Sequence, residues 1–422
     1  MSVDGRANIG EKSDSGLNRM ALLLSLGWVG TNLGLGIIDL PLKFLLKDQL
    51  RYSADQVSLF LALGIFTNYI KPIAGVITDS VPLFGSRRKN YLLVSLLLTG
   101  VGLFALGLVT HTWNSLLITY AIMYSMVVLT STTLGGVMVE VGMRHNAQGR
   151  LTSQRIGMFR IGSLAGGPIG GWMAAHLPFW MAMGAGSLMH LALVPLFLFC
   201  LPEERKAKLN LSLWSETGRQ LKGLARNRTL LGAAGMIFLI AASPGFGTPL
   251  LFFQTNSLNF TKEFVGILTL VGAGSGLLAT MLYHAVCKKV PLKKLLNASI
   301  LIHAAGTLFY LQYHDWKAAI WITAISGVSG TLAMVPVYDL ASRGTPKGSE
   351  ALGYSVMMSV WNLTNSLSDW TGSTLFKKAG FAFSHLVWLN SGTTLLALLF
   401  VPLLPRLLLI GVDGGQDHKN EQ

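Results

Sequence analysis

Runs of about 20 apolar residues, repeated along the whole chain, are the feature that most constrains how this sequence can fold. A run of this length spans the hydrocarbon core of a bilayer as an α-helix. The core holds no water, so each spanning segment must satisfy its own backbone polar groups. The sequence therefore predicts an all-α integral membrane protein with twelve transmembrane helices, at residues 20–45, 55–78, 91–110, 114–139, 154–176, 179–201, 229–253, 263–286, 295–312, 317–339, 351–376 and 383–409.

The composition and the placement of charge agree with a membrane protein. Charged residues make up only 12% of the 422 residues, about half the share found in a soluble domain. The formal net charge of +14 does not indicate nucleic-acid binding, because most Lys and Arg fall in alternate loops and in the tails. This asymmetry follows the positive-inside rule and predicts cytoplasmic termini. We expect a multi-pass protein of the plasma (inner) membrane, surrounded by lipid bilayer, with no nucleic-acid partner.

A polar stretch at about 202–228 divides the predicted helices into six and six. It carries seven Lys and Arg against three Glu. Trp214 and nearby leucines fall on one face of a possible helix that would lie on the inner leaflet; a flexible linker is the alternative. The predicted domains are an N-terminal six-helix bundle at 1–201, a cytoplasmic linker at 202–228 and a C-terminal six-helix bundle at 229–422. Such halves, related by a pseudo-two-fold axis, hold the substrate between them in many secondary transporters.

The segment 71–89, between the second and third apolar runs, has an informative order of residues. Gly75 stands four residues before Asp79, and Arg87 and Arg88 precede the next helix. This order resembles the loop between helices 2 and 3 of the major facilitator superfamily. The resemblance implies that the loop latches the cytoplasmic side of a carrier, with a small residue at Gly75 allowing two helices to approach closely. Asp79 can pair with a neighbouring Arg and with a helix N-terminus. The alternative is a loop whose charges only set the topology.

Three further stretches narrow the family. They are Pro41–Asp48 with Ser53 and Gln56, Ser243–Gly247 with Phe252–Phe260, and Pro346–Ala351 with Met358–Leu363. Together with the segment 71–89 they resemble the folate–biopterin transporter family of the major facilitator superfamily, over residues from about 30 to 380. The resemblance implies a major facilitator-type fold and secondary active transport, by alternating access, of a small organic anion that is folate- or pterin-like.

The end of the fourth run departs from that family. Members often carry acidic residues shortly before the Glu that closes helix 4, whereas here Glu140 follows turns of Gly, Ser and Thr at 130–136. The departure weakens the inference of a proton-coupled folate carrier and keeps an unrelated amino acid, drug or anion open as the substrate. A non-transporting membrane assembly factor on the same fold is an alternative of another class. We expect no enzyme activity and no cofactor, because no nucleophile–base set and no metal-ligand spacing is present.

Ionisable residues inside the predicted spans are functional candidates, because a charge within the bilayer is costly. Arg160 is the leading substrate residue, since a guanidinium can bind a carboxylate through two parallel hydrogen bonds; a structural pair with Glu140 is the alternative. Asp39 could relay a proton or hold a pterin ring, or it could face outer water or pair with a nearby lysine. Lys71, Glu140 and Asp339 are expected to act in gating or coupling. For Lys71 the alternative is snorkelling to the headgroups.

Aromatic and amide side chains supply the other predicted substrate contacts. Aromatic rings could stack on a flat heterocycle, and amides offer donors and acceptors to its edges; simple packing is the alternative for each ring. The residues are Trp28, Asn32, Phe252, Phe253, Trp361 and Asn362.

Other features are interpreted mainly as structural. Glycines four residues apart in 162–171 allow close helix packing. Pro244 and Gly245 predict a bend in helix 7, where freed carbonyls can line the cavity. Cys200 and Cys287 lie in predicted helices near the cytoplasmic side, so a structural disulfide is not expected. We expect a monomer.

Overall fold

The computed structural model describes residues 4–145, 147–202, 209–210, 212–287, 290–344, 350–378 and 381–404. Every regular element in these residues is helical. Eight helices are long and apolar enough to cross a membrane by length and composition, and two bent helix pairs would raise the number to ten. The all-α membrane fold is therefore confirmed, whereas the count of twelve spans stays a prediction.

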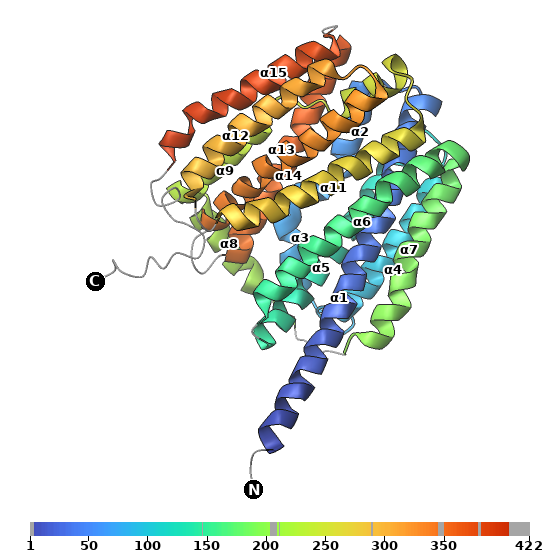
Figure 1. Ribbon diagram of the computed structural model, residues 1–422. Helices are drawn as coiled ribbons and strands as arrows, with labels where there is room; N and C mark the ends of the chain where they lie inside the picture. The colour runs from blue at the N-terminus through green and yellow to red at the C-terminus, as the bar shows by residue number, and fades with distance from the viewer. Residues whose placement is uncertain are drawn as a thin grey trace. The chain divides into compact units, whose positions relative to one another are not determined.

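The elements follow the predicted apolar runs along the chain (Figure 1). The first half forms α1 (Asp4–Phe44), the π-helical turn η1 (Leu45–Gln49), α2 (Ala54–Gly64), the 3-10 turn η2 (Phe66–Ile70), α3 (Lys71–Ser80), α4 (Lys89–Leu108), α5 (Trp113–Arg144), α6 (Gln148–His176) and α7 (Phe179–Cys200). The second half forms α9 (Arg228–Ala241), α10 (Gly247–Phe252), the π-helical turn η3 (Phe253–Ser257), α11 (Lys262–Cys287), α12 (Leu292–Leu308), η4 (Phe309–Gln312), α13 (Trp316–Arg343), α14 (Glu350–Lys378), α15 (Phe383–Leu396), η5 (Ala397–Leu399) and η6 (Val401–Leu403).

The predicted linker contains a helix, α8 (Ser212–Leu224). The helical interpretation of this stretch is thus confirmed for the residues that the structure describes. Trp214 is 44% exposed, whereas Leu224 is buried. The helix therefore keeps the indole ring of Trp214 on its surface, as expected of a helix that lies on a bilayer.

Two helices that coincide with predicted spans, α6 and α14, are not among the strongly apolar ones. Each has 29 residues, which is long enough to cross a bilayer. Both are rich in small and hydroxyl residues, and they carry Arg160 and Asp369 respectively. Such helices cannot face lipid on all sides, because polar groups within a membrane face the interior of the bundle or a water-filled cavity.

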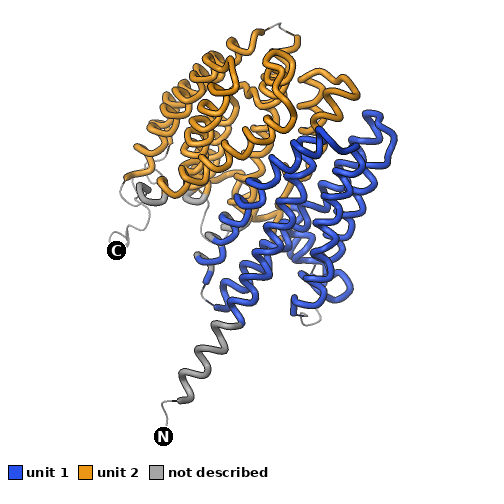
Figure 2. Tube along the Cα trace, turned by 45° about the vertical axis from the view of Figure 1, so that its right-hand side comes forward, with its two compact units in different colours: residues 1–42, 73–215 blue, residues 43–72, 216–422 orange. Residues whose placement is uncertain are grey.

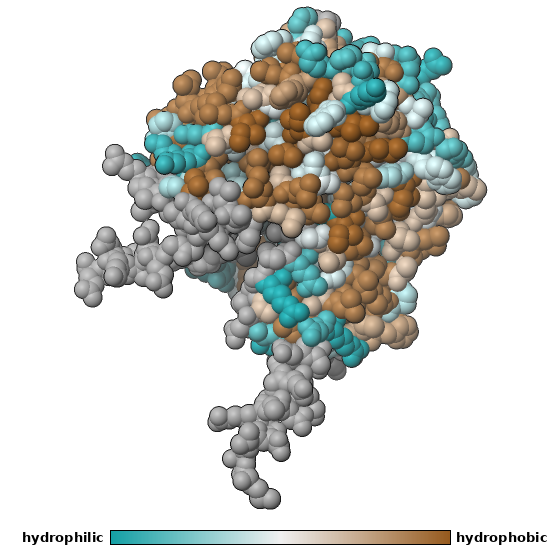
Figure 3. Space-filling model, viewed as in Figure 1, coloured by the Kyte–Doolittle hydropathy of each residue, from teal (hydrophilic) through white to brown (hydrophobic). Residues whose placement is uncertain are grey.

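Large apolar side chains lie on the outside of helices in both halves (Figure 3). Leu188 is 65% exposed, Leu278 67% and Trp321 70%. A soluble monomer rarely exposes large contiguous apolar patches. The exposed leucines and tryptophans are those of a protein whose helices contact lipid.

The chain divides by its internal contacts into two compact units (Figure 2): residues 1–42 with 73–215, and residues 43–72 with 216–422. In the first unit α4 packs against α5 and α7, and α6 also packs against α5 and α7. In the second unit α13 packs against α11 and α12, and α14 packs against α2 and α9. The segment 43–72 thus belongs by contact to the second unit. The units differ from the predicted bundles 1–201 and 229–422, whose boundaries stay a prediction.

Glycines bring helices close together in both units. A Cβ added to Gly166 of α6 would lie 2.7 Å from the Cα of Gly36 in α1. A Cβ added to Gly327 of α13 would overlap the carbonyl oxygen of Gly272 in α11. The expected close packing of the 162–171 stretch is therefore present, against α1.

The same backbone turn ends α1 and α10. η1 and η3 are both π-helical turns of five residues. Each is followed by one residue and then by a non-glycine residue with φ of 54°, Arg51 in the first and Asn259 in the second. In both, the backbone N–H groups on either side of that residue donate to the first two carbonyls of the turn, at 2.9 to 3.1 Å. Pro41 and Pro249 precede their turns by the same interval. The two turns therefore share one backbone conformation, as a repeat between the two halves of the chain predicts.

Candidate functional site

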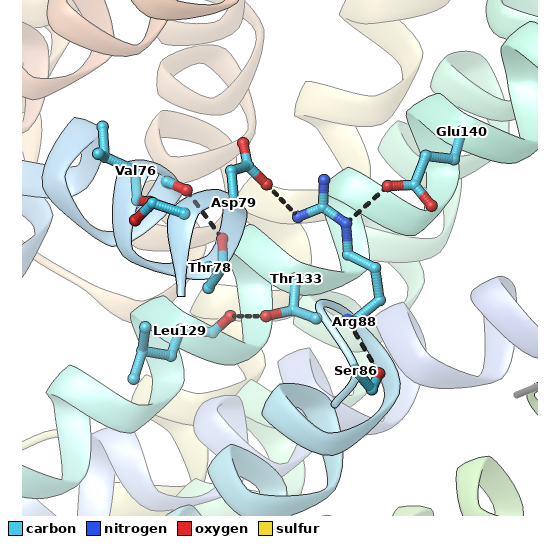
Figure 4. A network of polar contacts seen from close by, with 10 residues as sticks. Val76, Thr78, Asp79, Ser86, Arg88, Leu129, Thr133 and Glu140 are labelled. Carbon is cyan, nitrogen blue, oxygen red and sulfur yellow. Dashed lines mark hydrogen bonds and ion pairs between the residues drawn. The ribbon is translucent and has the colours of Figure 1, made fainter. Parts of the chain in front are cut away.

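Arg88 joins two carboxylates in the first unit (Figure 4). Its Nη1 forms an ion pair with Asp79 Oδ1 at 2.8 Å, and its Nε donates a hydrogen bond to Glu140 Oε1 at 2.8 Å. The Asp79 contact is close in distance but does not have hydrogen-bond geometry. The Arg88 side chain is only 13% exposed, against 50% for Asp79 and 44% for Glu140. A largely buried cation therefore holds the ends of α3 and α5 together.

The local sequence places Arg88 at this position. Asp79 is the penultimate residue of α3, and Arg88 is the residue just before α4. Between them, Leu83 and Ser86 exchange two backbone hydrogen bonds, at 2.9 and 3.1 Å. Gly85 completes that turn with φ of 80°, a left-handed value that glycine adopts without a steric cost. The Arg88 N–H then donates to Ser86 Oγ at 3.3 Å. The turn thus reverses the chain and directs Arg88 toward α3.

Gly136 of α5 makes room for the Arg88 guanidinium. A Cβ at Gly136 would lie 2.5 Å from Arg88 Cζ, whereas a Cβ at the neighbouring Gly135 would meet nothing within 4 Å. Gly75, which the sequence pattern singled out for close approach, has space: its Cβ would meet only Thr132 Cγ2, at 4.0 Å. The required small residue is therefore Gly136, which sequence reasoning had noted only as part of the departure from the family pattern.

Arg160 lies half-buried on α6 and has no ion pair or hydrogen bond to any described residue. Its neighbours Phe159 and Ile161 are 49% and 47% exposed. Glu140, considered from the sequence as a structural partner, bonds to Arg88 instead. The Arg160–Glu140 pair therefore does not form in this structure.

Trp28 and Asn32 of α1 are engaged within the first unit. Trp28 is 4% exposed, and Arg155 Cζ lies 4.5 Å from its ring centre as a cation–π contact. Asn32 Nδ2 donates to the Trp28 carbonyl at 2.7 Å. Stacking of a ligand on Trp28 would therefore require Arg155 to move. Asp39, further along the same helix, is exposed and has an interaction partner.

Phe252 and Phe253 have different environments in the second unit. Phe253 stacks on Phe383, with ring centres 4.6 Å apart and planes at 7°. It belongs to a packed aromatic cluster, as the packing alternative expects. Phe252 is half-buried, and Lys47 Nζ lies 5.4 Å from its ring centre. Of this pair, Phe252 lines the pocket described below.

The remaining predicted residues are half-buried. Trp361 meets Tyr338 edge to face, with ring centres 5.9 Å apart. Asn362 makes no hydrogen bond through its side chain to any residue in the described ranges. Three gating candidates each have an interaction partner: Lys71, Arg87 and Asp339.

The seventh predicted span, at 229–253, is broken at the predicted place, between the end of α9 at Ala241 and the start of α10 at Gly247. The Gly245 N–H donates to the Ser368 carbonyl at 2.9 Å, and Asn390 Nδ2 donates to the Pro244 carbonyl at 2.9 Å. Neighbouring helices α14 and α15 thus bond the backbone groups freed by the break. The expectation that freed carbonyls line a cavity here stays a prediction.

Asp369 of α14 caps the helix that follows the break. Its Oδ1 accepts the Thr248 N–H at 2.9 Å, and its Oδ2 accepts the Thr248 hydroxyl at 2.6 Å. The first N–H groups of a helix lack partners within the helix, and a carboxylate satisfies them. Asp369 therefore has a structural role.

A pocket of about 530 Å³ lies within the second unit, where η1, η3 and the end of α14 meet. Lys47, Arg51 and Lys377 line it, together with the rings of Phe252 and Phe376. Of this set, sequence reasoning named only Phe252 as a site residue. The basic residues lie at helix ends that are far apart in the chain, so no sequence pattern connects them.

Neither cysteine nor metal chemistry is evident in the described residues. Cys200 is a free thiol, and the side chain of Cys287 lies outside the described set. No group of three His, Cys, Asp or Glu in the described ranges is placed to hold a metal ion.

Solved transporters share this arrangement of helices. A D-xylose-proton symporter matches 91% of this chain and 96% of its own, with a TM-score of 0.69 and 17% identity. The peptide transporter POT in complex with sulfate matches 93% of this chain and 96% of its own, with a TM-score of 0.70 and 11% identity. The fold and the apolar exterior define a multi-pass membrane protein with a major facilitator-type fold.

The chain belongs to the BT1 family, whose profile matches residues 32–421. It is 29% identical to the folate-biopterin transporter of Synechocystis sp. over 88% of this chain and 79% of the relative. It is 26% identical to folate transporter 2 of Plasmodium falciparum over 95% of this chain and 91% of the relative. These relatives are transporters and not enzymes, which confirms the class and the family predicted from the sequence.

Proposed function

We propose that this protein moves a folate- or pterin-like organic anion across the membrane as a secondary active transporter, by alternating access. The similarity to a folate-biopterin transporter along 88% of the chain supports the substrate class. The sequence carries no ATP-binding motif, so the driving force is an ion gradient or exchange. Asp39, an exposed carboxylate on α1, is the group we assign to proton coupling.

The observation that carries the proposal is the unneutralised cation at Arg160. An isolated charge within a bilayer costs at least ~2.5 kcal/mol, and Arg160 has no anionic partner among the described residues. A ligand carboxylate would supply that partner through a two-bond fork. The polar composition of α6 fits a helix that faces an interior cavity. Asn362, whose amide makes no hydrogen bond within the described ranges, is a second group available to a ligand from α14.

The Asp79–Arg88–Glu140 cluster acts as a latch in this proposal. α2 and the segment Phe66–Ser80 form a helix pair bent by 47°, and the boundary between the two compact units falls within α3, after Pro72. Arg88 holds the far end of α3 within the first unit. Breaking its ion pairs would release that end when the two halves rearrange. Arg87 and Gly75 are assigned to the same gating step on the basis of the resemblance. Lys71 and Asp339 are assigned to it because a charge within a predicted span is costly.

Ligand-dependent stabilisation tests the substrate class. Purified protein is heated with folates, pterins, amino acids or unrelated anions, because a ligand that binds only the folded state raises its stability by mass action. We expect folates or pterins to raise the melting temperature and to be taken up by proteoliposomes. A response only to an unrelated solute would replace the substrate class. Stability without uptake of any solute would favour an assembly factor.

Substitutions at Arg160 test the site. Arg160→Lys keeps the charge but loses the fork, so ligand affinity should fall. Arg160→Ala should reduce affinity further. An exchange of charges between Arg160 and Glu140 should also impair function, since the two do not pair. Wild-type affinity in both Arg160→Lys and the exchanged variant, in protein shown to be folded, would remove Arg160 from the binding site.

A further inference from the structure

We propose that the pocket between η1, η3 and the end of α14 is a second binding site, for an aromatic anion with two carboxylates. It goes beyond the central site assigned to Arg160. The topology predicted from the Lys and Arg distribution puts this pocket on the outer face, where it would meet solutes from that side.

The pocket has positive charge that no described residue neutralises. Its acid, Asp48, is already shared by Lys47 at 2.8 Å and by Lys262 at 3.2 Å. Arg51 and Lys377 are both exposed, and neither has an ion pair or hydrogen bond to a described residue. Two cations therefore remain for an incoming anion, and Arg51 can bind a carboxylate through two parallel bonds.

The backbone conformation at Arg51 favours a functional role for its side chain. Arg51 has φ of 54°, a left-handed conformation that Asn adopts far more readily than Arg. The equivalent turn in the second half places Asn259 at this position, with the same φ of 54°. The first half therefore uses the less favourable residue in the same backbone. Residues that break a local preference in this way are concentrated at functional sites.

The other walls of the pocket fit a flat, polar ligand. The rings of Phe252 and Phe376 border the pocket, and Asn256 and Ser53 add amide and hydroxyl groups. Lys47 is only 8% exposed and lies 5.4 Å from the Phe252 ring centre, which holds both side chains in place. A volume of about 530 Å³ accommodates a small aromatic ligand. The rings would contact an aromatic group while Arg51 and Lys377 contact its carboxylates.

N-benzoylglutamate is a suitable probe, because it joins one aromatic ring to two carboxylates. Its affinity for the full-length protein in neutral-lipid nanodiscs is measured by calorimetry at low and high salt. We expect binding that weakens with salt. Neutral benzamide should bind far more weakly.

Two substitutions and a matched control test the site. Arg51→Asn removes the charge but keeps a residue suited to the left-handed backbone, so the variant should melt at the wild-type temperature or above. We expect Arg51→Asn and Lys377→Gln each to weaken N-benzoylglutamate binding at least tenfold. Lys378→Gln is the control, because Lys378 Nζ lies 4.0 Å from Asp55 and does not line the pocket. It should keep wild-type affinity.

Other outcomes would overturn the proposal. Wild-type affinity in Arg51→Asn and Lys377→Gln would do so. Loss of binding in Arg160→Gln but not in Arg51→Asn would place the probe in the central site. In nanodiscs with anionic lipid, stabilisation of the wild type but not of Arg51→Asn, together with no N-benzoylglutamate binding, would assign the pocket to a lipid headgroup. Failure of the central site alone would leave Arg51-dependent binding intact, so the two proposals fail separately.

Discussion

Replacing Gly136 with alanine should open the Arg88 cluster, while the same change at Gly135 should leave it intact. The new Cβ at Gly136 would lie 2.5 Å from Arg88 Cζ, whereas carbon atoms in contact are separated by about 3.5–4 Å. The guanidinium must therefore move by about 1 Å. Since it is the end of a flexible side chain, the clash itself costs little. The loss comes from the two ion pairs, both of which are 2.8 Å long.

The expected magnitude follows from exposure. Asp79 and Glu140 are 50% and 44% exposed, so solvent screening limits each pair to about 1 kcal/mol. Arg88 is only 13% exposed, so losing both partners raises the total toward ~3 kcal/mol. Replacing either glycine with alanine also stabilises the helix by up to ~1 kcal/mol, because alanine has the higher helix propensity. Gly135→Ala should therefore be more stable than Gly136→Ala by about 1–3 kcal/mol.

Thermal and chemical unfolding of both variants, in wild-type and Arg88→Ala backgrounds, measures this difference. Without the guanidinium the added methyl has no clash, so Gly136→Ala should become as favourable as Gly135→Ala. Transport should fall in Gly136→Ala and stay near wild type in Gly135→Ala, because about 1.4 kcal/mol shifts a two-state equilibrium tenfold. An equal cost of Gly136→Ala in both backgrounds would refute the role of Arg88.

Three further predictions concern the latch, the helix 7 break and the topology. Asp79→Asn should reduce transport while keeping most of the ligand affinity; wild-type turnover, or loss of binding alone, would remove Asp79 from gating. Asp369→Ala should destabilise the protein by about 1–2 kcal/mol, since Thr248 loses its cap, with Asp369→Asn intermediate; an unchanged unfolding midpoint would contradict the capping role. Cysteines placed in loops 79–90 and 255–262 should react with impermeant reagents from opposite sides of the membrane, and labelling from one side would disprove the predicted topology.

The main features of the fold could be predicted from the sequence because the bilayer demands long apolar helices. The sequence also predicted the break between α9 and α10, since Pro244 and Gly245 are poor helix residues in any surroundings. What the sequence could not show was how the break is satisfied. The partners Ser368 and Asn390 lie more than 100 residues away along the chain, and no local pattern links them to Pro244.

The candidate site was predictable in its residue types but less so in its pairings. The sequence pattern drew attention to Asp79 and Arg88, and the structure joins them. It gave Glu140 either a gating role or a structural pair with Arg160, but the observed partner of Glu140 is Arg88. It gave Gly75 a role in close packing, but the glycine that makes room for the Arg88 guanidinium is Gly136. The sequence could not distinguish the roles of Phe252 and Phe253, because both are phenylalanines in adjacent positions. The structure shows that Phe252 lines a pocket and that Phe253 stacks on Phe383.

The turns at Arg51 and Asn259 have the same backbone conformation, so each can be compared directly with the other within one protein. Each turn holds the same backbone in a different chemical setting, so a residue can be exchanged for its counterpart without asking the main chain to change. Arg51→Asn gives the first turn the residue that the second turn carries, and it removes the charge that the proposed second binding site needs. Asn259→Arg would attempt the reverse and show whether the second turn can accept the charge that the first one carries. Each of the two turns thus indicates a conservative substitution for the other.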